Sequence, residues 1–247
     1  MLPRQGARRR ACLHLLGTVG MSIYYQDEWV TLHLGDCLEV TDWLEADVLV
    51  TDPPYGRGWR QGEVHGNARN SASMVGILND SDTASRDSVL SLWGPRLAIV
   101  FGDLMLTPPP GVKHVGVYAK PADAGLRGAC GGVRRDAEAI YRLGPWPSGI
   151  GGRSSIYRTR VATVGNPMGI VARSGGHPHA KPLDVLEDLI DDCPPGVIAD
   201  PFAGSGSTLV AAKAMGRRAI GVELDERYCE MAARRLAQDA FDFGTGA

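Results

Sequence analysis

The chain has 247 residues, a length that suits one α/β domain with a full hydrophobic core. Its formal net charge is −2, so the overall charge does not point to a polyanionic partner, and no stretch approaches the ~20 apolar residues that span a membrane. The five cysteines are scattered without a C-x-x-C pair, which argues against both a zinc site and a disulfide framework.

The N-terminal segment, residues 1–20, carries basic residues followed by a short apolar run from Ala11 to Leu16. A weak signal peptide would have this pattern. We favour a disordered extension, with Met21 as the working start. Residues 21–247 are then expected to form a single domain, and the protein is predicted to be cytoplasmic.

Each of the first two predicted strands is followed closely by an acidic residue. The first, 29–34, runs into Gly35, Asp36 and Cys37, where Asp36 is either a ligand contact or an ordinary turn aspartate. The second, 47–51, is a short buried strand. It leads into a rigid turn that begins at Asp52.

This turn, Asp52-Pro53-Pro54-Tyr55, combines an acid, fixed carbonyls and an aromatic ring. The two prolines remove two backbone N–H donors and stiffen the chain. The turn is placed at the carboxyl end of a strand, where open α/β sheets bind ligands. Hydrogen-bond acceptors beside a ring face suit a planar substrate with an exocyclic NH2 group. The alternative interpretation is a rigid surface turn.

A long loop, about 56–82, follows and is rich in Gly, Asn, Ser and Asp. Loops of this length in a compact domain are usually functional or disordered, and we expect a mobile loop here. It contains Trp59, which could stack on a base or cover the protein surface, and the basic Arg60. A helix is predicted over 83–93. Strands are predicted over 96–101, 113–118 and 137–142, the last two forming an antiparallel edge.

Positive charge is concentrated between Leu104 and Lys181, where eleven Lys or Arg residues face only three Asp or Glu residues. A basic segment on an acidic body predicts a localised nucleic-acid face, although an arginine-rich solvated loop would have the same composition. Within it, 143–176 has no clean period and interleaves arginines with aromatic residues, as a nucleic-acid contact surface does. His177 and His179 lack a third ligand, so no metal is predicted.

The last part of the chain predicts a β-α-β unit with a glycine-rich first turn. A helix over 183–190 precedes a strand over 196–200, the turn reads Asp200-Pro-Phe-Ala-Gly-Ser-Gly206, and a helix over 208–215 leads into a strand over 218–223. Glycines there let the backbone approach a ligand at a helix N-terminus. Glu223 lies 17 residues after Gly206, where it could accept hydrogen bonds from ribose hydroxyls.

Two alternatives to this interpretation stay open at the level of the turn alone. A glycine-rich turn can serve only the close packing of a helix on a sheet. The third glycine of the dinucleotide fingerprint is missing, which disfavours NAD and leaves another adenosine-containing cofactor.

A closing helix, capped by Asp225, is predicted to run to about Gln238.

Together, the two turns resemble the amino-group DNA methyltransferases, the N4-cytosine/N6-adenine family. Asp52-Pro-Pro-Tyr55 resembles the catalytic motif of that family, and Asp200 to Gly206 resembles its S-adenosylmethionine motif. The order of the two motifs resembles the β-type permutation, and the resemblance covers about residues 24–238. It implies an α/β fold of the S-adenosylmethionine-dependent, Rossmann-like methyltransferase type. That fold is circularly permuted, with a mostly parallel seven-stranded sheet and an antiparallel edge strand.

The resemblance also implies a set of site residues. The catalytic residues would be Asp52, Pro53, Pro54 and Tyr55. The cofactor-binding residues would be Asp36, Cys37, Lys181, Asp200, Pro201, Phe202, Ala203, Gly204, Ser205, Gly206, Thr208, Glu223 and Leu224. DNA contacts are predicted at Trp59, Arg60, Arg153, Arg158, Arg160 and Arg173.

The implied activity is methyl transfer from S-adenosylmethionine to the exocyclic amino group of a flipped base in double-stranded DNA. Adenine N6 is favoured because Asp opens the tetrapeptide, a habit of the family, and cytosine N4 is the alternative. An RNA or protein amide methyltransferase, a nicotinamide oxidoreductase and a silent DNA-binding module are the other classes weighed. The recognition segment at 143–176 is short for the family, which points to a short target, a helper subunit or a dimer. We expect a prokaryotic or phage protein, monomeric or homodimeric, that can accompany a restriction nuclease.

Overall fold

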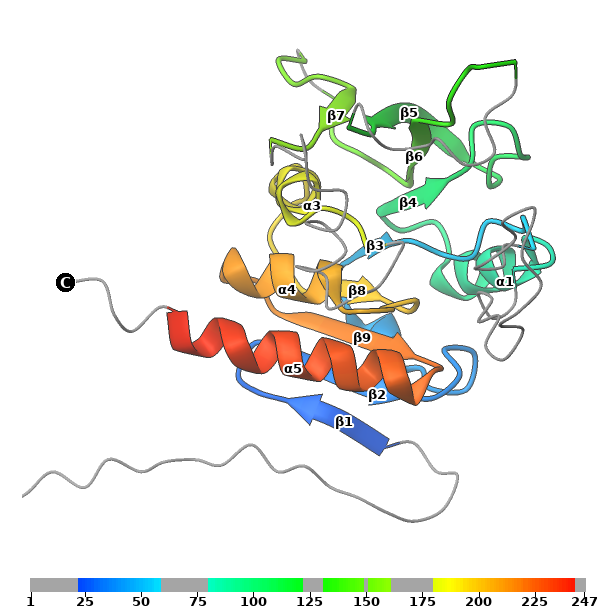
Figure 1. Cartoon of the computed structure of the whole chain (residues 1–247). Coiled ribbons are helices and arrows are strands. Elements are labelled where there is room, and N and C mark those ends of the chain that lie inside the picture. Colours follow the sequence, from blue (N-terminus) through cyan, green and yellow to red (C-terminus); the bar gives the residue numbers. More distant parts are fainter. Residues whose placement is uncertain (1–21, 59–79, 122–130, 149–150, 161–179, 243–247) are drawn as a thin grey trace, which may run out of the picture.

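The computed structural model describes residues 22–58, 80–121, 131–148, 151–160 and 180–242 (Figure 1). The expected N-terminal extension, 1–20, therefore lies outside the described residues. No helix in the described part of the chain is both long and apolar enough to cross a membrane.

A single nine-stranded sheet organises the fold, in the order β1-β2-β9-β8-β3-β4-β6-β5-β7. The strands are β1 (Ser22–Gln26), β2 (Val30–Leu34), β3 (Val48–Thr51), β4 (Ala98–Gly102), β5 (Val112–Ala119), β6 (Ala137–Leu143), β7 (Ile156–Arg158), β8 (Ile198–Asp200) and β9 (Ala219–Glu223). The helices are η1 (Asp42–Glu45), α1 (Ala84–Trp93), α3 (Leu183–Asp191), α4 (Ser207–Ala214) and α5 (Glu226–Asp242). Each predicted helix corresponds to one of these, while the short η1 was not predicted.

The sheet corrects the predicted seven strands with one antiparallel edge. Strands β2, β9, β8, β3 and β4 run parallel through the centre. The antiparallel β6 lies between β4 and β5 rather than at an edge, and β1 is antiparallel to β2 at the other margin. The two unpredicted strands, β1 and β7, are the edge strands. Edge strands bury little apolar surface, so their sequences lack the continuous apolar run that marked β3 and β4.

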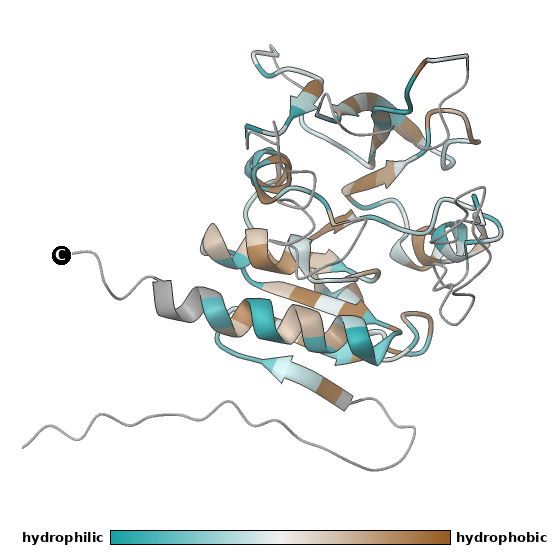
Figure 2. Ribbon diagram, in the orientation of Figure 1, coloured by the Kyte–Doolittle hydropathy of each residue, from teal (hydrophilic) through white to brown (hydrophobic). Residues whose placement is uncertain are grey.

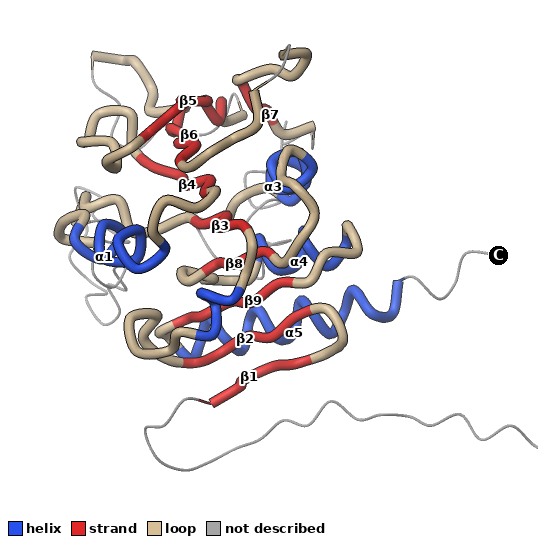
Figure 3. The backbone as a smooth tube through the Cα atoms, turned by 180° about the vertical axis from the view of Figure 1, so that it is seen from behind, coloured by secondary structure: helices blue, strands red, loops and turns tan. Residues whose placement is uncertain are grey.

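Alternating residues of the central strands face two separate cores. Val48 and Val50 of β3 belong to a cluster with residues of α3, α4 and α5, whereas Leu49 between them belongs to a cluster with Trp43 and Trp93. Because successive strand residues point to opposite faces, this pattern requires that both faces be covered. Figures 1 and 3 show α4 and α5 together on one face of the sheet. Figure 2 shows that the central strands of the sheet carry mainly hydrophobic residues.

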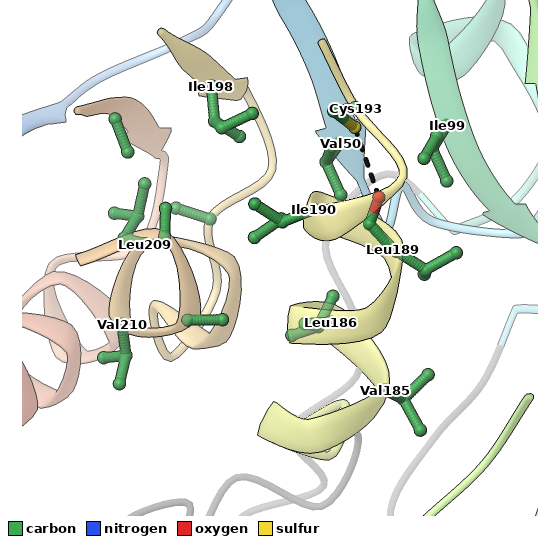
Figure 4. Packing of buried hydrophobic residues seen from close by; sticks show 14 of the residues in the cluster. Val50, Ile99, Val185, Leu186, Leu189, Ile190, Cys193, Ile198, Leu209 and Val210 are labelled. Carbon is green, nitrogen blue, oxygen red and sulfur yellow. Dashed lines mark hydrogen bonds between the residues drawn. The ribbon is translucent and has the colours of Figure 1, made fainter. Parts of the chain in front are cut away.

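The amphipathic helix α3 ties the sheet to α4. Its buried residues Val185, Leu186, Leu189 and Ile190 recur at helical spacing, and Figure 4 shows Leu186 and Ile190 on the side that faces Leu209 of α4. The helix ends where the Cys193 thiol donates to the Leu189 carbonyl at 3.2 Å. This packing positions the segment just before α3, and that segment contains Lys181.

Candidate active site

Acidic residues follow the carboxyl ends of five neighbouring parallel strands. In spatial order across β2, β9, β8, β3 and β4 they are Asp36, Glu223, Asp200, Asp52 and Asp103. Parallel strands end at the same edge of a sheet, so these carboxylates gather along one rim. The sheet register thus brings together two turns that lie about 150 residues apart in the chain.

A direct hydrogen bond joins the two turns. The hydroxyl of Thr51, the residue before Asp52, donates to Asp200 Oδ1 at 2.7 Å. Strands β3 and β8 pair side by side, with Leu49 opposite Ala199. The two turns therefore lie side by side at one edge of the sheet.

The acid that opens the glycine-rich turn, Asp200, is almost fully buried. Burial raises the pKa of Asp200 to about 6, and the nearby charge of Asp52 adds to the rise, although hydrogen bonds from Thr51, Thr208 and the Phe202 N–H oppose it. A buried carboxylate with a raised pKa, at the rim of a sheet, is suited to form an ion pair with a cationic group of a ligand.

The glycine-rich turn has the backbone shape that its sequence predicted. Gly206 precedes α4 in the left-handed region, with φ +77°, and a Cβ there would come within 2.7 Å of Ala232 Cβ on α5. From α5, the Arg235 guanidinium donates to the Ser205 carbonyl at 2.7 Å and to the Ser207 hydroxyl at 3.1 Å. The turn is therefore shaped by its glycine and braced by an arginine that sequence reasoning missed.

Glu223, at the end of β9, holds the same turn from the other side. Its carboxylate accepts the Gly204 N–H at 2.7 Å and the Asp225 N–H at 2.8 Å. Burial raises the pKa of Glu223, while these two backbone hydrogen bonds lower it. Asp225 in turn accepts the Arg227 N–H at 2.9 Å, as expected of an N-cap of α5.

The loop after β2 lies beside β9, since Leu34 pairs with Glu223 and the Gly35 N–H donates to the Glu223 carbonyl at 2.9 Å. Asp36 closes this loop by accepting the Leu38 N–H at 2.9 Å. Cys37 is buried, and burial raises the pKa of its thiol to about 12. Cys37 can therefore act only as a neutral thiol or through its backbone.

The remaining predicted cofactor residues cluster on the glycine-rich turn and the start of α4, apart from Leu224. Leu224 is exposed after β9. The buried or partly buried members are Pro201, Phe202, Ala203, Ser205 and Thr208. Lys181, the last of the predicted cofactor residues, precedes α3.

Lys181 contacts the catalytic turn. Its ammonium donates to Asp52 Oδ2 at 2.5 Å and to the Tyr55 hydroxyl at 3.1 Å, while the Tyr55 hydroxyl donates to Asp52 Oδ1 at 2.7 Å. Of the other two residues of the turn, Pro53 is buried and Pro54 partly buried. Burial disfavours the charged lysine, but the charges of Asp52 and Glu138 outweigh it, and the pKa of Lys181 is raised. The structure thus joins Lys181 to Asp52 and adds Glu138, a residue that sequence reasoning did not identify.

The base of the predicted 56–82 loop is tied together at its described ends. Asp80 accepts the Gly56 N–H at 2.8 Å, and Arg57 forms an ion pair with Asp103 after β4. Trp59 and Arg60, the predicted DNA contacts in this loop, lie outside the described residues.

Two of the predicted DNA-contacting arginines, Arg153 and Arg160, lie beside the acidic helix α3. Arg153 pairs with Asp191 at 2.9 Å and also with Asp192, and Arg160 pairs with Asp188 at 2.8 Å. Arg158 is exposed at the end of β7. Arg173 falls outside the described residues, as do His177 and His179. Among the residues that the structure describes, no group of three or more His, Cys, Asp or Glu side chains could hold a metal ion.

Comparisons with known proteins show that this chain is similar to methylases. The family described as DNA methylase matches residues 149–234. The putative methylase YubD of Escherichia coli K12 is 30% identical over 227 residues, which cover 82% of this chain and 88% of that protein. The DNA adenine methyltransferase YhdJ, also of E. coli K12, is 42% identical over 62 residues, or 24% of this chain and 21% of that protein.

Solved structures share the fold. The cytosine-N4-specific PvuII DNA methyltransferase superposes with a TM-score of 0.58 at 15% identity, covering 84% of this chain and 86% of that one. The M1.HpyAVI–SAM complex gives a TM-score of 0.53 at 19% identity, covering 84% and 99%.

Proposed function

The chain belongs to the N6/N4 DNA methylase family, whose members transfer a methyl group from S-adenosylmethionine to an amino group of DNA, and from this premise we propose that its target atom is adenine N6. The single observation that supports an amino-group methyltransferase site is the contact between the two turns, in which Thr51 donates to Asp200 at 2.7 Å. Through this contact, an acceptor for an amino group and an acid for a cationic ligand group share one rim.

Asp52 and Pro53 would prepare the target nitrogen. In a free base, the lone pair of the exocyclic nitrogen is delocalised into the ring. Hydrogen bonds from the NH2 group to the Asp52 carboxylate and the Pro53 carbonyl favour a tetrahedral nitrogen, and the negative charge stabilises the positive charge that develops there. As the new N–C bond forms, one amino proton leaves toward the acceptors.

Tyr55 would bind the base itself. An amino group inside the duplex cannot be reached, so the base must leave the stack, and an aromatic ring is a suitable surface to receive it. Its hydroxyl bonds to Asp52 at 2.7 Å, which restrains the ring beside the carboxylate. The sequence has no Pro-Cys nucleophile motif, so a covalent route to C5 of cytosine is disfavoured.

The residues at the cofactor side fit S-adenosylmethionine. Asp200 would pair with its ammonium group, Glu223 would accept hydrogen bonds from its ribose hydroxyls, and Asp36 would accept from its adenine amino group. Gly204, with φ of +52° and no side chain, would allow close approach of the ligand, whereas the missing side chain of Gly206 makes room for Ala232 of α5. When bound, S-adenosylmethionine supplies a sulfonium methyl group, whose S–C bond breaks as the N–C bond forms.

The pH dependence of cofactor binding follows from Asp200. Its pKa is raised to about 6, so below that pH the protein binds a proton that must leave before the ammonium pairs. We expect the affinity for S-adenosylhomocysteine, which keeps the ammonium, to fall by at most roughly tenfold per pH unit below 6. The contribution of Asp200 to folding has the opposite sign, because a raised carboxyl pKa makes stability fall as pH rises toward 6. Calorimetric titration of the protein and of Asp200→Asn between pH 5 and 8 checks this, and an unchanged slope in the variant would contradict it.

Adenine is preferred to cytosine because Asp, rather than Ser, opens the tetrapeptide, and because the relative YhdJ is described as a DNA adenine methyltransferase. Cytosine N4 stays the second candidate, since a carboxylate can accept from either amino group. A monomer or homodimer, with a companion restriction nuclease, remains a prediction.

The decisive experiment uses S-adenosylmethionine labelled in its methyl group. The protein is incubated with the label and plasmid DNA, and the DNA is digested to nucleosides. Label on N6-methyl-2′-deoxyadenosine supports the proposal, and label on N4-methyl-2′-deoxycytidine selects the second candidate. Label only in RNA or protein, offered in parallel, would reject DNA as the substrate.

Arg158 is the arginine that we expect to contribute most to DNA binding among those of β7 and the adjoining chain. It is exposed, whereas Arg160 is already neutralised by Asp188 at 2.8 Å. Arg158→Ala should lower DNA affinity and reduce the slope of log K against log salt by roughly 0.9. Arg160→Ala is the matched control and should change the slope less. Fluorescence anisotropy at several salt concentrations measures both, and equal slopes for the two variants would argue against the assignment.

A further inference from the structure

A partly buried carboxylate on β6 lies beside the catalytic turn. Glu138 accepts from Lys120 at 2.5 Å, lies 3.3 Å from the Lys181 ammonium and lies 3.4 Å from the Tyr55 hydroxyl oxygen, whose proton goes to Asp52. Its side chain is 13% exposed. The proposed mechanism has not used this group, and nothing in the local sequence marks it.

The strand around Glu138 holds it in a fixed place. β6 pairs with strands on both sides, with Ala139 opposite Gly102 of β4 and Glu138 opposite Tyr118 of β5. A side chain on an internal strand is positioned more rigidly than one on a loop. Glu138 is therefore a fixed partner for Lys181, which precedes α3.

Lys181 uses all its hydrogen-bonding capacity in this cluster. An ammonium carries three N–H donors, and three acceptors surround it, namely Asp52 at 2.5 Å, the Tyr55 hydroxyl at 3.1 Å and Glu138 at 3.3 Å. A buried ammonium is tolerated only when it is paired and hydrogen-bonded in this way. Burial opposes ionisation of Glu138, but the charges of Lys181 and Lys120 outweigh it and lower its pKa to about 2. The cluster is therefore built from ions.

The charges of the cluster determine the electrostatic environment of the target nitrogen. Asp52 and Lys181 alone form a neutral pair. Glu138 pairs with both Lys181 and Lys120, so the four groups are neutral overall. Methyl transfer brings positive charge to the amino nitrogen, and the negative charge of Asp52 stabilises it more when Lys181 also pairs with Glu138 than when Asp52 alone neutralises Lys181.

We propose that Glu138 is a positioning residue for methyl transfer, which binds the third N–H of Lys181 and balances its charge so that Asp52 stays an effective acceptor for the target amino group. This proposal rests on the proposed function of Asp52 and Tyr55. Glu138 acts through Lys181 and need not touch the base.

The test is Glu138→Gln, which keeps the size of the side chain and removes its charge. The single-turnover rate of methyl transfer should fall roughly 10- to 100-fold, the range for lost hydrogen bonds between charged groups. Cofactor affinity and the KM for DNA should be unchanged, and the protein should stay folded at the assay temperature, with a melting temperature only a few degrees lower. Glu138→Asp keeps the charge and should recover part of the rate. Asp136→Asn, which removes a carboxylate paired with Arg134 on the same segment, is the matched control and should react at the normal rate.

A second measurement asks whether Glu138 acts through Lys181. In a Lys181→Met background, the change Glu138→Gln should alter the remaining rate by less than about twofold, because the partner that it serves is gone. A merely structural glutamate would cost the same factor in both backgrounds, and that result would overturn the proposal.

Two further results would also overturn it. One is a normal transfer rate in Glu138→Gln. The other is a slower rate accompanied by equal losses in cofactor affinity and melting temperature, which would assign Glu138 to folding. If the unchanged protein transfers no label to DNA, the proposed function has failed, and the labelled-plasmid experiment reveals this before any variant is made.

Discussion

Replacing Asp52 by Asn should reduce methyl transfer by roughly 10²- to 10³-fold or more while leaving cofactor binding within about twofold. The substitution keeps the shape of the turn but removes the negative charge that receives the amino protons. It also presents an NH2 group to at least one of the two donors that Asp52 now accepts, Tyr55 and Lys181. The single-turnover rate with labelled S-adenosylmethionine measures transfer, and calorimetric titration measures cofactor affinity.

Asp82→Asn is a suitable control for Asp52→Asn, because Asp82 is an exposed acid that accepts the Ala84 N–H at the start of α1. Asp52→Ala should be as inactive as Asp52→Asn if the charge is what matters. Loss of cofactor affinity with transfer intact would show that Asp52 belongs to the cofactor side, and our assignment of the two turns would then be wrong.

Replacing Glu223 by Gln should have the second large effect, a loss of cofactor affinity of roughly 100-fold. Both carboxylate oxygens accept backbone N–H groups, from Gly204 at 2.7 Å and Asp225 at 2.8 Å. An amide must turn its NH2 group toward one of these donors, and hydrogen bonds to a charged group contribute about 1.5–3 kcal/mol each. The glycine-rich turn would then lose its support from β9, and the proposed acceptor for the ribose hydroxyls would be weakened.

Calorimetric titration of Glu223→Gln with S-adenosylhomocysteine measures this loss without DNA. Asp225→Asn is the matched control in the same segment, because its side chain accepts the Arg227 N–H rather than holding the glycine-rich turn. At saturating cofactor, Glu223→Gln should recover most of its transfer rate. A slow rate at saturation with normal affinity would contradict a cofactor role for Glu223.

Several parts of the fold could be predicted because their signals are local. β3 and β4 are continuous apolar runs buried on both faces, and such runs mark central parallel strands. The turn before α4 needs a left-handed residue, and Gly206 supplies it. The acids Asp52, Asp200 and Glu223 each stand at or just after the end of a predicted strand, so parallel pairing alone was enough to bring them to one rim.

The edges of the sheet could not be predicted in the same way. β7 has three residues, of which only Tyr157 is buried, and it lies in an arginine-rich stretch without a period. Such a strand is selected by its pairing with β5 and by the contact of the Tyr157 hydroxyl with Asp192 at 2.8 Å. Neither partner can be recognised from the three residues themselves.

The sequence by itself determined the positions of the inner strands, the two turns and the edge of the sheet at which they lie, since apolar runs, glycines and strand-end acids act through their own neighbours. Only the tertiary structure determined which carboxylate pairs with each lysine or arginine side chain. Lys181 was assigned to the cofactor from its neighbours in sequence, yet its ammonium lies on Asp52, 129 residues away, and Arg160 lies on Asp188, 28 residues away. A flexible charged side chain carries no periodicity that identifies its partner, so its role is set by the packing of α3 and β6 around it.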